Sequence, residues 1–208
     1  MLDVKKIRLI LELRESGISD SKILSAIEKI PREKFIPENF RNQAYDNLAL
    51  PIGDNQTISQ PFVVAKMTQL LEVKSSHKIL EIGTGSGYQS AVLSKLVRRV
   101  YTIERIKNLL IKAEKIFQEL NISNIVPKYA DGNLGWKEQI PFDRIIITAA
   151  TSHISQEISS QIEEGGIIVS PINSKNKQII VKYKKINNVL VSEIYDDVLF
   201  VPNLSGTE

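Results

Sequence analysis

The feature that most constrains the fold is a turn with three glycines at alternate positions, Gly83, Gly85 and Gly87, directly after an apolar run at residues 79–82. The run is typical of a buried strand, and residues 88–96 carry apolar side chains at helical spacing. Glycine adopts positive φ and lets the backbone approach a ligand closely. This strand, turn and helix therefore predict an α/β fold with a cofactor bound against the turn.

Two acidic residues narrow the kind of cofactor. A dinucleotide fingerprint requires glycine or alanine where this chain has Tyr88. Glu81 would repel a pyrophosphate but could pair with a cationic amino-acid group. Glu104 ends a second apolar strand, where an acid binds ribose hydroxyls in nucleoside-binding α/β domains. The pattern E-x-G-x-G-x-G and Glu104 together resemble the class I methyltransferases that bind S-adenosylmethionine; the alternative is a glycine-rich turn in another α/β protein.

Composition places the chain among ordinary globular proteins. Its 208 residues, 42% hydrophobic and 25% charged, suit a single domain over residues 1–208. We predict an N-terminal helical extension and flap at 1–60 and a Rossmann-like core at 61–208. With no cysteine and two histidines, of which His77 is interpreted as a surface residue, no metal site is predicted. A net charge of +3 and the lack of a long apolar run predict no nucleic-acid or membrane partner, and a cytoplasmic monomer is the default.

The N-terminal part is predicted to be helical up to the flap. Apolar spacing predicts a helix over residues 3–16 and a second helix with Ser19 as its N-cap. The irregular apolar stretch at residues 45–53 is predicted to form the flap. A further helix follows, with Ser59 or Gln60 as its N-cap, so the local pattern alone makes Ser59 a capping serine.

The remainder alternates strands and helices. A proline within the strand at residues 125–129 predicts an edge position, and Asp131 just beyond it could reach an adenine amino group. A helix is predicted at residues 154–162, then a strand that Pro171 stops, and Asn187-Asn188 predicts the turn of a hairpin. These elements predict a doubly wound, mostly parallel seven-stranded sheet with helices on both faces, N-terminal helices and an antiparallel C-terminal hairpin.

Four blocks make the resemblance more specific, and they span nearly the whole chain. With them the sequence resembles the protein-L-isoaspartate O-methyltransferases. The block T-I-S-Q-P is the one typical of that family, whereas the glycine block indicates only the methyltransferase class. The blocks are residues 56–61, residues 80–89, Pro141-Phe142-Asp143 with Thr148-Ala149-Ala150, and Gly165-Gly166 through Pro171 with Gln178.

The resemblance implies a reaction and a set of site residues. Enzymes of this family move a methyl group from S-adenosylmethionine to the free α-carboxylate of an L-isoaspartyl residue in a damaged protein or peptide, which initiates repair. By the same resemblance Ser59 is the catalytic residue, and Thr57, Ile58, Gln178, Val201 and Pro202 bind the substrate. The residues implied to bind the cofactor are Glu81, Gly83, Thr84, Gly85, Ser86, Gly87, Glu104, Arg105, Asp131 and Gly132.

The chain departs from the family pattern in two places. Thr151, Ser152 and Ser155 stand where the family has an alanine and two prolines, and Asn203 stands in place of a leucine. The first change is predicted to loosen a turn near the ligand. Two alternatives therefore stay open: a methyltransferase acting on another substrate, such as a small molecule or RNA, and a cofactor-binding module with weakened catalysis.

Overall fold

The computed structural model describes residues 2–208, with side chains from residue 4 onward. Its centre is a seven-stranded sheet in the order β5-β4-β3-β6-β7-β8-β9, in which the first five strands are parallel and β8 pairs antiparallel with both β7 and β9. The fold class predicted from the sequence is confirmed. The strands are β3 (Lys78–Ile82), β4 (Arg99–Glu104), β5 (Ile125–Tyr129), β6 (Phe142–Ile147), β7 (Ile162–Ser174), β8 (Lys177–Ile186) and β9 (Val189–Val198).

Apolar side chains on both faces of the central strands explain why the sheet is buried. In β6, Ile146 belongs to the larger core cluster, whereas Ile145 and Ile147 belong to the cluster on the opposite face. Such continuous apolar runs are typical of parallel strands that are covered on both sides. The larger cluster unites the sheet with α1 (Leu2–Glu15), α2 (Ser21–Lys29), α3 (Pro61–Leu70), α4 (Tyr88–Ser94) and α5 (Lys107–Glu119).

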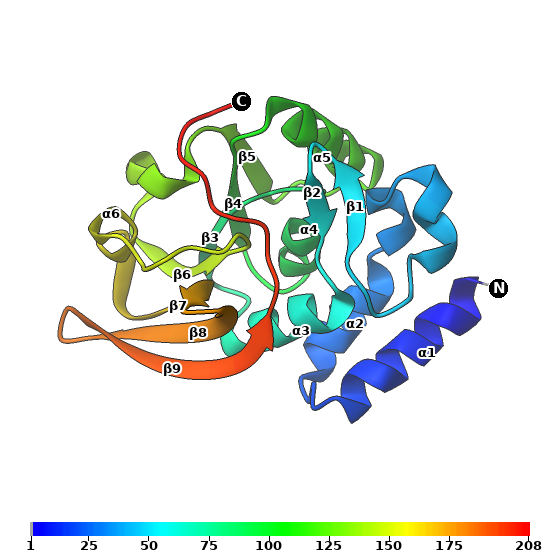
Figure 1. Cartoon of the computed structure of the whole chain (residues 1–208), viewed down its shortest axis with the longest axis horizontal. Helices are drawn as coiled ribbons and strands as arrows, with labels where there is room; N and C mark the ends of the chain where they lie inside the picture. The colour runs from blue at the N-terminus through cyan, green and yellow to red at the C-terminus, as the bar shows by residue number, and fades with distance from the viewer. Residues whose placement is uncertain (1) are drawn as a thin grey trace.

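The N-terminal elements lie beside the sheet and end in a small hairpin (Figure 1). Two 3₁₀ helices, η1 (Arg32–Phe35) and η2 (Glu38–Gln43), lead into β1 (Leu50–Gly53) and β2 (Gln56–Ile58), which pair with each other. The predicted flap over residues 45–53 thus forms part of a two-stranded hairpin. The division of the chain into an extension and a core stays a prediction.

Two predicted helix boundaries were wrong. Asp20, rather than Ser19, caps α2, because its carboxylate accepts the Lys22 N–H at 2.8 Å while the Ser19 hydroxyl lies near Gln69. The helix predicted over residues 154–162 is the short α6 (Gln156–Ser159), and β7 begins at Ile162.

Pro171 does not stop the strand that contains it. Strand β7 continues to Ser174, although β6 pairs with it only as far as Val169. The Asn173 N–H, two residues beyond the proline, donates to the Thr151 carbonyl and not to β8. Residues two apart on a strand point the same way, so the nitrogen of Pro171 faces away from β8 and no ladder hydrogen bond is lost.

Other local predictions had mixed outcomes. Strand β5 is an edge strand, as its proline predicted. The hairpin turn at Asn187 and Asn188, with φ of 50° and 62°, is also confirmed. His77 was wrongly predicted to lie on the surface: it is buried, its Nδ1 accepts the Lys74 N–H, and burial lowers its pKa.

No helix among residues 2–208 is long and apolar enough to cross a membrane.

The last ten residues, 199–208, which we call the tail, run from the end of β9 across the carboxyl edge of the parallel strands (Figure 1). Val201 and Asn203 exchange backbone hydrogen bonds with Ala150, which follows β6. Further along, Glu208 exchanges backbone hydrogen bonds with Arg105 and Lys107, which follow β4. The tail therefore covers the edge of the sheet at which ligands bind in open α/β folds.

Candidate active site

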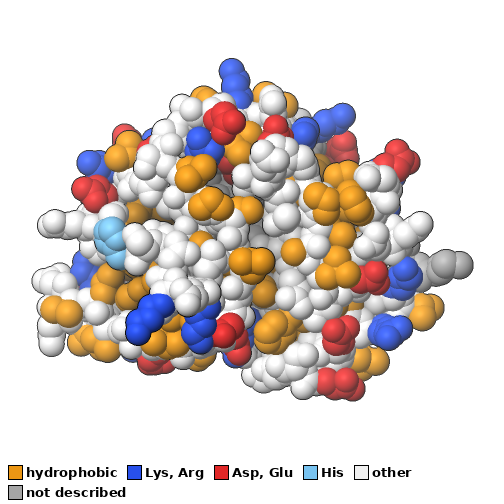
Figure 2. Space-filling view, viewed as in Figure 1, with side chains coloured by type: hydrophobic (Ala, Val, Ile, Leu, Met, Phe, Trp, Pro, Cys, Tyr) orange, Lys and Arg blue, Asp and Glu red, His pale blue; other side chains and the backbone are white. Residues whose placement is uncertain are grey.

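A cavity opens at the carboxyl ends of β3, β4 and β6, under the tail. It encloses about 850 Å³, part of which is open to solvent, and the face in which it lies is hollowed near its centre (Figure 2). Twelve of the sequence-predicted site residues line it: Thr57, Ile58, Ser59, Gly83, Thr84, Gly85, Ser86, Glu104, Arg105, Gly132, Val201 and Pro202. The predicted residues that do not line it are Glu81, Gly87, Asp131 and Gln178.

Each of the three glycines in the turn is required for its own physical reason. All three have positive φ: 98° at Gly83, 53° at Gly85 and 88° at Gly87. A Cβ at Gly83 would lie 2.4 Å from the Thr148 hydroxyl, and one at Gly87 would lie 2.7 Å from the Phe117 ring. Gly83 and Gly87 therefore permit close packing of the turn, whereas Gly85 lies against the cavity with its N–H turned to Glu104.

Glu104 is held in a fixed orientation by the backbone. Its Oε2 accepts the Gly85 N–H at 2.7 Å and its Oε1 accepts the Ile106 N–H at 2.9 Å. A carboxylate has about four acceptor sites, so about two remain free. Glu104 lines the cavity, and these remaining sites suit a pair of vicinal hydroxyl donors.

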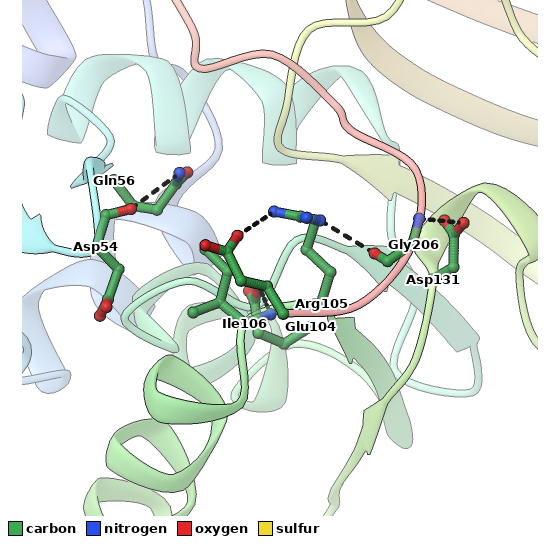
Figure 3. Close-up of polar contacts among 8 residues, drawn as sticks. Asp54, Gln56, Glu104, Arg105, Ile106, Asp131 and Gly206 are labelled. Atoms are coloured by element: carbon green, nitrogen blue, oxygen red, sulfur yellow. Dashed lines mark hydrogen bonds and ion pairs between the residues drawn. The ribbon is translucent and has the colours of Figure 1, made fainter.

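Asp131 and Arg105 are engaged by the tail. Asp131 Oδ2 accepts the Gly206 N–H at 2.7 Å, and Arg105 Nε donates to the Gly206 carbonyl at 3.1 Å (Figure 3). Arg105 also forms an ion pair of 3.0 Å with Glu208. The predicted contact of Asp131 with an adenine amino group stays a prediction, because here its carboxylate is bonded to the tail and to Asn133.

Ser59 does not cap the helix that follows it. The N-cap residue of α3 is Gln60, whose side chain makes no capping hydrogen bond, and Pro61 occupies the first turn. Ser59 lines the cavity, and within residues 4–208 its hydroxyl forms no hydrogen bond to another protein group. Its side chain is therefore free to bind a ligand, which removes the capping role that the local pattern suggested.

Sequence reasoning missed Arg32, which lies behind Ser59. Its guanidinium is fully buried and donates to the Ser59 carbonyl at 3.0 Å. Nothing in the local pattern indicated this, because an arginine usually lies on the surface. Thr148 was noticed only as part of a sequence block; its hydroxyl donates to the Gly83 carbonyl at 2.6 Å and fixes the end of β3.

Comparison with known protein families identifies the family of this chain. The family model for protein-L-isoaspartate(D-aspartate) O-methyltransferase matches residues 4–208. The chain belongs to this family. Among curated isoaspartate methyltransferases it is 46% identical over 98% of its length to one from Maricaulis maris and 49% identical over 97% to one from Parvibaculum lavamentivorans, covering 96% and 92% of those proteins.

Solved structures of isoaspartate methyltransferases share the fold. One superposes with a TM-score of 0.87 at 28% identity, covering 95% of this chain and 65% of that one. A second, described as a Plasmodium falciparum enzyme in complex with S-adenosyl-L-homocysteine, has a TM-score of 0.84 at 24% identity, covering 95% of this chain and 97% of that one. The first extends well beyond the length that this chain matches.

Two of the residues in which the chain departs from the family pattern, Ser155 and Asn203, are held by hydrogen bonds. Ser155 caps α6, where its hydroxyl accepts the Ile158 N–H at 3.3 Å. The side-chain amide of Asn203 donates to Asn133 at 2.7 Å, which fastens the tail near β5. These contacts hold Ser155 at the start of α6 and Asn203 in the tail, and the loosening of the turn stays a prediction.

Gln178 does not line the cavity but holds the tail. Its amide oxygen accepts the Phe200 N–H at 2.6 Å, and its amide nitrogen donates to the Phe200 carbonyl at 3.2 Å. Phe200 immediately precedes Val201 and Pro202, which line the cavity. Gln178 therefore fixes the tail from β8, and its predicted role in substrate binding would be indirect.

Gln178→Ala is expected to raise the KM for an acceptor peptide about fivefold, since two neutral hydrogen bonds of about 0.5–1.5 kcal/mol each no longer hold the tail. The dissociation constant for S-adenosylmethionine should change less than twofold. Steady-state kinetics and calorimetry measure the two quantities, and Lys177→Ala, an exposed change on the same strand, is the control. An unchanged peptide KM would show that the tail keeps its place without Gln178.

Proposed function

We propose that this chain transfers a methyl group from S-adenosylmethionine to the free α-carboxylate of L-isoaspartyl residues in damaged proteins and peptides, which initiates their repair. The observation that supports this most strongly is that the free Ser59 hydroxyl and the bonded Glu104 carboxylate line the same cavity as the glycine turn. Membership of the family gives the reaction its class.

The residues of the cavity fit the proposed cofactor. The bare backbone at Gly85 leaves room for a ligand along the turn, and Gly132 lines the cavity without a side chain. The spare acceptor sites of Glu104 would take the ribose hydroxyls, and Gly83, Thr84, Ser86 and Arg105 would border the same ligand. When bound, S-adenosylmethionine supplies an electrophilic methyl group on a sulfonium.

The proposed chemistry requires little acid or base catalysis from the protein. A carboxylate is already ionised at neutral pH, so no residue has to remove a proton from the nucleophile. The Ser59 hydroxyl would donate a hydrogen bond to the carboxylate and orient one of its oxygens. The hairpin of β1 and β2 and the tail border the cavity through Thr57, Ile58, Val201 and Pro202, and they would exclude water from it.

Ser59→Ala is expected to lower kcat/KM for an isoaspartyl peptide by about 10- to 100-fold, because a hydrogen bond to a charged group contributes about 1.5–3 kcal/mol. The assay is transfer of radiolabelled methyl groups to two hexapeptides that differ only in isoaspartate against aspartate. The wild type should label only the isoaspartyl peptide. Ser160→Ala, which changes an exposed serine just after α6, should behave as the wild type.

Two other outcomes of this assay would redirect the assignment. Labelling of neither peptide with intact cofactor binding would favour a methyltransferase for another substrate or a non-catalytic module. Labelling that is equally strong in Ser59→Ala would remove Ser59 from the catalytic residues while keeping the reaction. A cytoplasmic location and a monomeric state stay predictions from the sequence.

A further inference from the structure

Arg32 joins three separate stretches of the chain behind the active site. It lies in η1, and its side chain is 0% exposed. Its Nε donates to the Ala44 carbonyl at 2.9 Å, its Nη1 to the Ser59 carbonyl at 3.0 Å and its Nη2 to the Leu48 carbonyl at 3.2 Å. Ala44 and Leu48 precede the hairpin of β1 and β2, and Ser59 follows it, so one guanidinium holds both ends of that hairpin.

The positive charge of Arg32 is not neutralised by an acidic partner. Within residues 4–208 it forms no ion pair with a carboxylate, and its hydrogen-bond acceptors are three neutral carbonyls. The guanidinium carbon lies 5.0 Å from the ring centre of Tyr88, a buried residue that lines the cavity. Burial lowers the pKa of Arg32 to about 10, so the group stays charged at neutral pH.

Packing alone does not explain why a charged arginine is buried at this position. Moving a charge out of water is costly unless it is paired, and its field is strong where water is excluded. The charge lies one peptide group behind the cavity wall at Ser59, where the proposed substrate presents a carboxylate. A carboxylate bound there would gain from the field of Arg32, whereas a neutral group of the same shape would not.

We propose that Arg32 is a positioning residue for Ser59 and that its buried charge makes the site prefer a carboxylate to a neutral group. This rests on the proposed function, which names the carboxylate. Two separate effects follow from it. The hydrogen bond from Nη1 fixes the backbone of Ser59, and the charge acts on the ligand through the intervening peptide group.

Two substitutions separate the two effects. Arg32→Lys keeps the charge, but an ammonium lacks the planar fork that reaches three carbonyls, so the orientation of Ser59 should suffer. Arg32→Met keeps much of the volume and removes the charge. Arg41→Met, which removes an exposed arginine of η2 paired with Glu38, is the matched control.

The decisive measurement is a ratio of dissociation constants. Calorimetry in the presence of S-adenosyl-L-homocysteine compares an isoaspartyl peptide with its twin in which the α-carboxyl is an amide. Arg32→Met should reduce the preference for the carboxylate about tenfold, because it removes the attraction between the guanidinium and the peptide carboxylate. Arg32→Lys keeps a positive charge and should keep the preference. Arg32→Lys should instead lower kcat about tenfold, as expected for an imperfectly oriented Ser59.

Several results would overturn the proposal. A folded Arg32→Met with the wild-type preference would leave Arg32 as a structural residue only, because a loss of stability does not change a ratio of two affinities. Should that variant not fold, the wild type still gives a test. Salt screens a buried charge only weakly, whereas near 1 M salt exposed charges act over only about 3 Å. The preference of the wild type for the carboxylate over the amide must therefore persist near 1 M salt. A wild type that neither binds nor methylates the isoaspartyl peptide would count against the proposed function instead.

Discussion

Gly83→Ala is expected to weaken binding of S-adenosylmethionine by at least about 100-fold, which corresponds to about 2.7 kcal/mol. The residue has a φ of 98°, where a side chain is strained, and its new Cβ would meet the Thr148 hydroxyl at 2.4 Å. That hydroxyl is fixed by hydrogen bonds to the carbonyls of Ile82 and Gly83. Either Thr148 or the turn must move, and both line the cavity.

Two further variants test whether the clash is responsible. Gly165→Ala places a side chain at a φ of 76°, away from the cavity and with nothing within 4 Å of the new Cβ, so it is the control for a strained alanine and should leave the cofactor affinity unchanged. Thr148→Ala in the Gly83→Ala background leaves the nearest Thr148 atom at 3.7 Å, which is ordinary contact, and should restore part of the affinity. Calorimetric titration with the cofactor measures all three, and a Gly83→Ala protein of wild-type affinity would contradict the account of the turn.

The glycine turn could be predicted from the sequence because its determinants are local. Alternating glycines, an apolar strand before them and a helical pattern after them all lie within 20 residues, and the mostly parallel sheet follows from the repeated alternation of strands and helices. The outcome at Pro171 shows the limit of such rules. Its effect depends on which side of β7 has a neighbour, and that is decided by strands far away in the chain.

The interactions that the sequence did not indicate are long-range contacts of polar groups. Arg32 bonds to carbonyls 12, 16 and 27 residues further along, and carbonyls are present at every position, so no residue type marks its partners. The last residues of the tail carry no motif, yet Gly206 and Glu208 contact Asp131 and Arg105. Because the partners of both groups are set by tertiary packing, periodicity and propensity carry no signal for them.

Glu81 gives the second large expected effect, on stability as a function of pH. Its side chain is fully buried beneath the glycine turn, where Oε2 accepts the Ser90 hydroxyl and Oε1 has no partner. Burial in this setting raises the pKa of the carboxyl to about 8, against 4.5 for an exposed glutamate. The folded protein therefore keeps the proton of Glu81 at neutral pH.

Raising the pH should consequently destabilise the wild type through this one residue. Between pH 5 and pH 8 the unfolded chain has released the proton and the folded chain still holds it, so the free energy of unfolding falls as pH rises. At about 1.4 kcal/mol for each pKa unit, the loss reaches up to about 4 kcal/mol. Below pH 4.5 both states are protonated, and the contribution of Glu81 is fully retained.

Glu81→Gln isolates this effect, because the amide has nearly the same shape, accepts the Ser90 hydroxyl and cannot ionise. Urea unfolding at pH 5 and pH 8 should show that the variant gains stability relative to the wild type as pH rises, whereas Glu157→Gln, an exposed change on α6, should not. A parallel pH dependence in the Glu81 variant and the wild type would mean that Glu81 is ionised in the folded state. In that case burial would not be what sets its protonation, and the predicted cofactor-binding role of Glu81, whose side chain does not line the cavity, would still need a separate binding measurement.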